Sequence, residues 1–292
     1  MSVILPPDFD VLLYRNLHHD LKQAGFDDKG LAEHYLTYGK KEGRRCSNIT
    51  SRNDFISIIP RNRPILEIRP GFNPIITGEN VSYFETMNTA ELNEAAFNLN
   101  VSTHGIPAPQ YISPSCDLSI IDKQFSVVVS NHDLGKHTNL LKHISQIEQL
   151  LNDKGLLYCI LPDKNYSFGY YMPHASFASL LAAKVENRTT IPFQSIVEHT
   201  TLTTHHNSLL HWHGDHGNPI KKMVKNLDEV LNFTESAPEI YNRDIQINYF
   251  NADGFTELMD NIYLCGLTKL KVIRVYQPAR LNSEFYAVLQ KQ

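Results

Sequence analysis

The chain has 292 residues, of which 42% are hydrophobic and 20% charged, as in a globular protein large enough to bury a full core. Its formal net charge of −4 provides no basic field, so nucleic acid is not expected as a partner. No apolar stretch has bilayer length and the start lacks a signal-peptide pattern, so we expect a cytoplasmic protein without a membrane span. The four cysteines include no C-x-x-C pair, so neither a disulfide framework nor a cysteine zinc site is expected.

The first segment of the chain, residues 1–50, has the apolar spacing of a small helical module. One short helix is predicted from four leucines, and a second from three larger apolar residues, with Gly39 placed to end it. The residues that carry these predictions are Leu12, Leu13, Leu17 and Leu21, then Leu31, Tyr35 and Tyr38. We therefore predict a helical module over 1–50 and an α/β domain over 51–292.

The α/β domain opens with a strand, a turn and a second strand. Residues 64–68 form a buried apolar run, Gly71 and Asn73 are turn residues, and residues 81–85 form a strand that ends in Glu85. In open α/β sheets this arrangement holds a nucleoside, because the turn lets backbone approach the ligand and the acid accepts hydrogen bonds from ribose hydroxyls. The segment therefore predicts a nucleoside site.

The middle of the domain alternates between helices and strands. A helix is predicted over 89–99, a short strand over 118–121 and a buried, β-branched strand over 125–130. The clearest helix has its apolar stripe between 140 and 151, and Gly155 stands where a left-handed cap is needed before the next strand. This order of continuous apolar strands and helices predicts a parallel sheet covered on both faces.

The α/β rhythm stops at residues 163–241, which we predict to be a lid over the carboxyl edge of the sheet. Helices near 175–186 and 219–233 flank a polar, histidine-rich segment in this region. After the lid, a helix around 255–262 precedes two further strands. The two strands predicted at the end of the chain cover 270–276 and 284–289.

Three stretches of the α/β domain carry a family pattern. Residues 67–74 match the loop E-I-G-P-G-F-N-P with Arg69 at its first glycine, residues 125–137 resemble F-D-x-V-x-x-S-H-V-x-E-H, and residues 161–168 resemble I-P-D-K-R-Y-T-F. These patterns resemble class I S-adenosylmethionine-dependent methyltransferases associated with bacterial polysaccharides, and the N-terminal segment is similar to a helical module found beside glycosyltransferases. The resemblance implies a Rossmann-like class I methyltransferase sheet, mostly parallel with an antiparallel C-terminal hairpin and a helical lid.

The resemblance also implies where S-adenosylmethionine would bind. Glu85 would hold the ribose, Glu67 would order the loop beside the methionine part, and Asp117 would lie near the adenine edge. Asn131 and His132 end the fourth strand, where the methyl acceptor and the cofactor meet. The cofactor-binding residues implied in this way are Glu67, Gly71, Phe72, Asn73, Glu85, Asp117 and Asn131.

Histidines supply the candidates for a general base. Six of the 14 histidines lie between residues 199 and 216, and an imidazole titrates close enough to neutral pH to deprotonate an acceptor hydroxyl. The candidate catalytic residues are His132, His211 and His213; the last two share a face only if their segment is extended. Two other interpretations of the segment are a metal site in the lid and a polar lid without chemistry.

Arg69 leaves the function open between different classes of protein. Its side chain would pair with Glu67 or Glu85, bind the carboxylate of the cofactor, or fill the pocket where the family has a glycine. The first expectation is a methyltransferase that O-methylates a saccharide or glycan intermediate. Its partner would then be a small-molecule or glycan acceptor. The alternatives are an inactive scaffold that binds glycan-assembly proteins in polysaccharide biosynthesis, and a metal-dependent enzyme that uses the histidine-rich lid.

Overall fold

The computed structural model describes residue 5, residues 9–231 and residues 245–292, and the chain divides into two compact units, Met1–Ile58 and Ile59–Gln292. The first unit is helical, and Asp10 and Asp27 begin two of its helices by accepting backbone hydrogen bonds. Its small core is formed by Tyr14, Leu21, Leu31, Tyr35 and Cys46. Its helices are α1 (Val11–Leu17), α2 (His19–Gln23), α3 (Asp28–His34) and α4 (Arg52–Ser57), with a π-helical turn at Tyr35–Gly39.

The predicted apolar faces of this unit are only partly correct. The leucine stripe does not lie on one helix, because the chain turns at His18 between α1 and α2. Leu12 is 60% exposed and Tyr38 is 57% exposed, whereas Tyr14 is fully buried. Tyr14 packs edge-on against Tyr35. The core is therefore built around an aromatic residue that the leucine spacing did not indicate.

The second unit contains a seven-stranded sheet with the order β3-β2-β1-β4-β5-β7-β6. The first five of these strands pair in parallel, and β7 is antiparallel to both of its neighbours. The sheet is thus the predicted Rossmann-like, class I methyltransferase arrangement with an antiparallel C-terminal pair. The strands are β1 (Ile65–Ile68), β2 (Val81–Glu85), β3 (Tyr111–Ile112), β4 (Phe125–Asn131), β5 (Leu151–Pro162), β6 (Leu270–Tyr276) and β7 (Glu284–Lys291).

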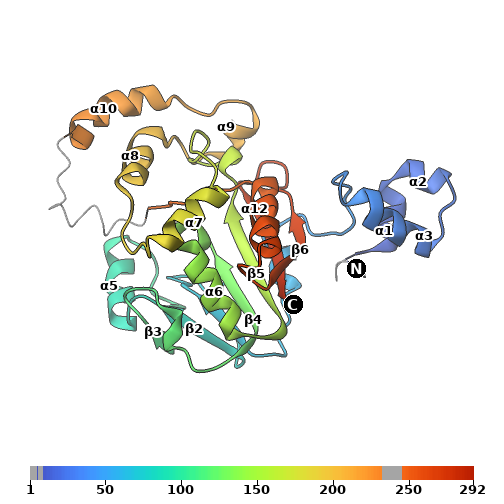
Figure 1. Ribbon diagram of the computed structural model, residues 1–292, viewed down its shortest axis with the longest axis horizontal. Coiled ribbons are helices and arrows are strands. Elements are labelled where there is room, and N and C mark those ends of the chain that lie inside the picture. Colours follow the sequence, from blue (N-terminus) through green and yellow to red (C-terminus); the bar gives the residue numbers. More distant parts are fainter. Residues whose placement is uncertain (1–4, 6–8, 232–244) are drawn as a thin grey trace. The chain divides into compact units, whose positions relative to one another are not determined.

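Helices cover the sheet and close its core. In Figure 1, α6, α7 and α12 lie over the face of the sheet turned toward the viewer. Their buried side chains, such as Ile144, Leu180 and Phe255, belong to the same apolar cluster as the strand residues Leu66 and Val128. The helices outside the lid are α5 (Thr89–Asn98), α6 (Leu140–Leu150) and α12 (Ala252–Leu264), with short 3₁₀ turns at Leu118–Ile120 and Leu134–Lys136.

The lid region is more helical than its sequence pattern indicated. Helices α7 and α10 correspond to the two predicted helices, and α10 packs on α8. The part of the predicted lid at 232–241 lies outside the described residues. The elements of the described part are a 3₁₀ turn at Lys164–Tyr166, α7 (Phe177–Val185), α8 (Phe193–Leu202), α9 (Ser208–Trp212) and α10 (Pro219–Leu231). Over the described part of the chain, no helix has the length and apolar character needed to cross a membrane.

Two local predictions in the sheet are wrong. The strand predicted at 118–121 is a 3₁₀ turn, because the Asp117 side chain accepts from Ser119 N and starts a turn; the third strand lies upstream at Tyr111–Ile112. Gly155 does not cap α6, since that helix passes directly into β5 at Leu151. Leu151 is fully buried and pairs with Phe125, so burial in the sheet outweighs the local cap signal.

The register of the sheet brings the candidate residues to one edge. Ile68 at the end of β1 is opposite Phe84 in β2 and Ser130 in β4, so these three strands end together. The residues that follow them in the chain therefore meet at the carboxyl edge, which is where ligands bind in open α/β sheets.

Candidate functional site

Two buried carboxylates hold the loop between β1 and β2. Glu67 accepts from Ile75 N at 2.9 Å and from Ile76 N at 3.2 Å. Glu85 accepts from Gly71 N at 2.6 Å and from Thr86 N at 3.1 Å. Burial raises the pKa of Glu85, while these backbone hydrogen bonds oppose the rise. Two of the three acids expected to bind the cofactor, Glu67 and Glu85, thus brace the loop in this structure.

The loop itself has an open position at Gly71. Its φ is +59°, a left-handed conformation that favours glycine, and a Cβ placed there would have no atom within 4 Å. Phe72 is half-buried and Asn73 is exposed on the same turn. A ligand can therefore approach the backbone at Gly71, as the sequence predicts for a nucleoside loop.

Arg69 has a partner that the sequence did not indicate. Its Nη1 donates to Oδ1 of Asp133 at 3.0 Å, and its backbone N donates to Phe84 O at 2.8 Å. The Arg69 side chain is 25% exposed, whereas that of Asp133 is 1% exposed. Since Asp133 comes directly after Asn131 and His132 at the end of β4, this ion pair connects the carboxyl ends of β1 and β4.

Asp133 is the centre of a buried polar cluster. Nε2 of His137 lies 2.8 Å from Oδ2 of Asp133, and Nε2 of His143 lies 3.3 Å from the same oxygen. Burial alone would raise the pKa of Asp133, but the charge of His137 and the contacts of both histidines hold it well below its usual value. Burial, reinforced by the charge of His137, lowers the pKa of His143 to about 4, so that this ring is neutral near pH 7.

Cys116 belongs to the same side of the sheet edge. It follows β3 in a turn in which its N donates to Ser113 O at 2.9 Å, and its φ of +54° is left-handed. Burial, and then the negative charge of Asp133, raise the pKa of its thiol to about 12. The neighbouring Asp117 faces its own turn, accepting from Ser119 N at 3.0 Å and from the side chain of Gln146.

His132 is held by a carboxylate from the last strand. Its Nε2 lies 2.6 Å from Oε1 of Glu284, the first residue of β7. The His132 side chain is 39% exposed and that of Glu284 17%, and His132 has a left-handed φ of +53°. An imidazole oriented by a carboxylate and open to solvent at a sheet edge has the arrangement of a general base.

A polar pocket lies beyond the end of β5. It has a volume of about 260 Å³ and includes the stacked rings of Tyr166 and Trp212, whose centroids are 4.0 Å apart and whose planes differ by 3°. Burial raises the pKa of Asp163 on its wall to about 6, although Asn165 N and Ala252 N donate to this carboxylate. The other polar side chains that line it are Asn165, Asn251, Asp253 and Gln277.

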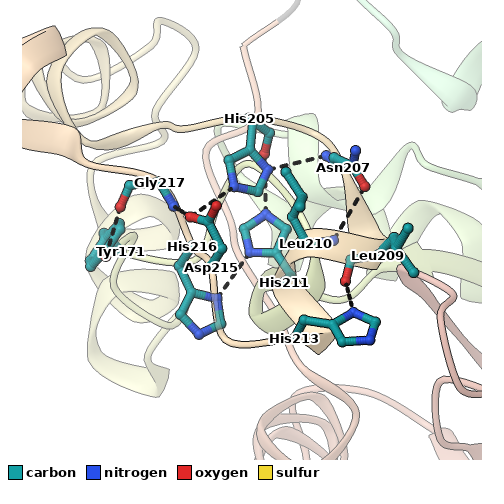
Figure 2. A network of polar contacts seen from close by, with 10 residues as sticks. All are labelled: Tyr171, His205, Asn207, Leu209, Leu210, His211, His213, Asp215, His216 and Gly217. Atoms are coloured by element: carbon teal, nitrogen blue, oxygen red, sulfur yellow. Dashed lines mark hydrogen bonds and ion pairs between the residues drawn. The ribbon is translucent and has the colours of Figure 1, made fainter.

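The histidine-rich segment forms a network of its own, shown in Figure 2. His211 is buried, with Nδ1 3.0 Å from Nδ1 of His216 and Nε2 3.2 Å from the carbonyl oxygen of His205. His213 is exposed, and its Nδ1 lies 2.7 Å from Leu209 O within α9. Because the segment is helical there, His211 and His213 point to different sides (Figure 2). The two predicted bases are therefore not brought together.

No protein-family model matches this sequence, and no curated protein matches it. Among solved structures, it resembles the CurJ carbon methyltransferase at 12% identity and a TM-score of 0.37, over 81% of this chain and 50% of that chain. The CcbJ methyltransferase from Streptomyces caelestis has 10% identity and a TM-score of 0.42, over 82% of this chain and 92% of that chain.

A third similar structure is a SAM-dependent methyltransferase from Thermotoga maritima, described as a possible histamine N-methyltransferase. It has 9% identity and a TM-score of 0.42, over 97% of this chain and 100% of that chain. At these identities the likeness concerns the fold alone.

Sequence reasoning missed the acids that organise the site. Asp133 directly follows the predicted fourth strand, so its position at the carboxyl edge was available as a signal. Glu284 lies 152 residues from His132, and only the antiparallel pairing of β7 with β5 brings it to this edge. The partner of His132 therefore had no local signal in the sequence.

Proposed function

We propose that this protein binds S-adenosylmethionine at the edge formed by β1, β2 and β4 and transfers its methyl group to a hydroxyl of a saccharide. The observation that carries the proposal is the braced loop. Glu67 and Glu85 fix the backbone around Gly71, where no atom lies within 4 Å of a Cβ position. Carboxylates can accept more than one hydrogen bond per oxygen, so Glu85 can still receive a ribose hydroxyl.

The pocket beyond β5 is the acceptor site in this proposal. Amide and carboxylate side chains around it can bind sugar hydroxyls, and Trp212 beside Tyr166 offers an aromatic surface for the apolar face of a sugar ring. The resemblance to polysaccharide-associated methyltransferases agrees with a saccharide or glycan intermediate as acceptor. That this methylation is a step in glycan assembly is also part of the proposal.

His132 is the base that we propose for the transfer. S-adenosylmethionine supplies a methyl group on a sulfonium, which becomes a neutral thioether when the C–S bond breaks and the O–C bond forms. The protein must then accept the proton of the acceptor hydroxyl, and Nδ1 of His132 can do so while Nε2 donates to Glu284, which orients the ring. His211 is less suited, because both of its nitrogens already contact lid atoms.

A second candidate function is favoured by Arg69. The ion pair between Arg69 and Asp133 crosses the carboxyl ends of β1 and β4, at the position where the family loop has a glycine. If this pair occupies the place of the cofactor, the protein is a binding or scaffold component of polysaccharide assembly without methyl transfer.

Calorimetric titration of the full chain with S-adenosylmethionine and S-adenosylhomocysteine separates the two functions. Micromolar binding with one site per chain supports the methyltransferase, and transfer is then measured on a panel of saccharides. Absence of binding at millimolar ligand overturns the first proposal and favours the scaffold.

A further inference from the structure

Three side chains that the proposed methyl transfer does not use converge at the sheet edge. Cys116 comes from the turn after β3, His137 follows the 3₁₀ turn Leu134–Lys136, and His143 lies in the first half of α6. One potential ligand atom from each of the three lies within 4.8 Å of the others. Among the residues that the structure describes, these three form the one group of at least three histidine, cysteine or acidic side chains that are close enough together to hold a metal ion.

The two histidines are prepared for this role by Asp133. Their rings stack with centroids 3.4 Å apart and planes 15° apart, and both direct Nε2 toward the same carboxylate oxygen. A carboxylate that faces one ring nitrogen fixes the orientation of the imidazole and leaves the other nitrogen for a cation. In His137 and His143 the remaining nitrogen is Nδ1.

The buried position of His143 points to a missing ligand. Its side chain is 2% exposed, and among the described residues neither Nδ1 nor Nε2 has a hydrogen-bond partner, although Nε2 lies 3.3 Å from Oδ2 of Asp133. A buried polar atom is normally satisfied, since leaving one without a partner costs about 1–3 kcal/mol. A cation bound at Nδ1 would satisfy this atom.

We propose that Cys116, His137 and His143 bind a zinc-type divalent cation, with water in the fourth coordination position. On binding, the Cys116 thiol releases its proton to solvent, and the resulting thiolate and two neutral imidazoles are ligands that Zn²⁺ accepts in tetrahedral sites. Bond lengths of about 2.3 Å to sulfur and about 2.0–2.1 Å to nitrogen place such ligand atoms roughly 3.3–3.6 Å apart. The ligand atoms must therefore approach one another from a separation of up to 4.8 Å, and one of the two parallel rings must turn out of the stack, because a metal lies in the plane of each imidazole that binds it.

This site is separate from the histidine-rich lid, and the inference does not rest on methyl transfer. It joins the turn after β3 to α6 and shares Asp133 with Arg69. A bound cation would thus stabilise the folded chain and connect two elements at the carboxyl edge.

The test measures the stoichiometry and affinity of zinc binding by the full chain. The protein is first freed of metal with a chelator and desalted, and zinc chloride is then added in the presence of a chromophoric chelator that competes for the metal. Wild type is expected to bind one zinc per chain. Cys116→Ser is expected to lower the affinity at least about 100-fold, since loss of even an outer-shell partner lowers metal affinity by roughly 10–100-fold. His143→Phe, which keeps a ring to stack on His137, is expected to do the same.

Matched controls are Cys265→Ser, which removes an exposed thiol, and His213→Asn, which removes an exposed lid imidazole. Both should bind zinc as wild type does. Cobalt(II) gives a second measurement, because a thiolate-to-cobalt charge-transfer band should appear in wild type and vanish in Cys116→Ser. Circular dichroism establishes that each variant is folded.

Three results would overturn the proposal. The first is a wild type that retains no zinc at micromolar free metal. The second is equal affinity in wild type, Cys116→Ser and His143→Phe. The third is loss of zinc on His211→Ala with retention in Cys116→Ser, which would place the metal in the lid.

Discussion

Arg69 and Asp133 form an ion pair of 3.0 Å between side chains 64 residues apart. Arg69 has a left-handed backbone conformation, with φ at +50°, of the kind that favours glycine. A left-handed conformation costs a non-glycine residue about 1–2 kcal/mol, so the side chain must be held by something in the fold. The buried carboxylate of Asp133 does this, and Arg69 in turn supplies a cation to an acid that is 1% exposed.

The first prediction concerns cofactor binding by Arg69→Gly. If the guanidinium, 25% exposed, also meets the carboxylate of S-adenosylhomocysteine, the variant should bind this ligand about tenfold more weakly. Calorimetry on the folded variant measures the change, with Arg63→Gly, an exposed arginine before β1, as control. Tighter binding by Arg69→Gly would show that the ion pair obstructs the site and would support the scaffold function.

A second prediction concerns the brace at Glu85. In Glu85→Gln one amide N–H must face Gly71 N or Thr86 N, both of which donate to the wild-type carboxylate. We expect the free energy of unfolding to fall by about 1–3 kcal/mol and S-adenosylhomocysteine binding to weaken. Urea unfolding and calorimetry measure the two effects. Glu79→Gln, at an exposed glutamate before β2, should change neither, and an unchanged Glu85→Gln would remove this acid from the loop.

The third prediction separates catalysis from binding at His132. Once an acceptor is found, His132→Ala should lower kcat by about 10²–10⁴-fold, as expected for loss of a general base, while the Kd for S-adenosylmethionine stays the same. Glu284→Gln keeps a hydrogen-bonding group 2.6 Å from the ring and should cause a smaller loss. His104→Asn, at an exposed histidine, is the control. A wild-type kcat in His132→Ala would exclude it as the base.

The sheet could be predicted because its signals are local. Continuous apolar runs such as that around Val128, and the acid that ends β2, are visible within a few residues and fix which side chains reach the carboxyl edge. The edge strand Tyr111–Ile112 could not be found, because two residues carry no periodicity. The cap expected at Gly155 failed because burial of Leu151 in the sheet is decided by tertiary packing.

The site could be predicted only in part, because some of its contacts are local in the sequence and others are created by the tertiary fold. Gly71 and Glu85 belong to one strand–turn–strand segment, so the sequence places them together. The partners of Arg69 and His132 come from distant strands, and topology alone creates those contacts. In the lid, the helix α9 separates His211 from His213, which a polar histidine-rich pattern did not reveal.

The last prediction concerns the pH dependence of stability caused by Asp163. Burial raises its pKa from 3.8 to about 6, so between these values the folded chain holds a proton that the unfolded chain has released. The stabilisation from this proton is complete below pH 3.8 and is lost as the pH rises through about 6. Asp163→Asn stays neutral, so its free energy of unfolding relative to wild type should rise by roughly 2–3 kcal/mol between pH 4 and pH 7.

Chemical unfolding of both proteins at several pH values measures this difference, and other titrating groups cancel because they are common to the pair. Asp122→Asn is the control, since it removes an exposed carboxylate that does not line this pocket. A difference between Asp163→Asn and wild type that stays constant from pH 4 to pH 7 would mean that Asp163 is already ionised at pH 4. Its anion would then be stabilised by the amides of Asn165 and Ala252, and the pocket beyond β5 would carry a fixed negative charge at every pH tested.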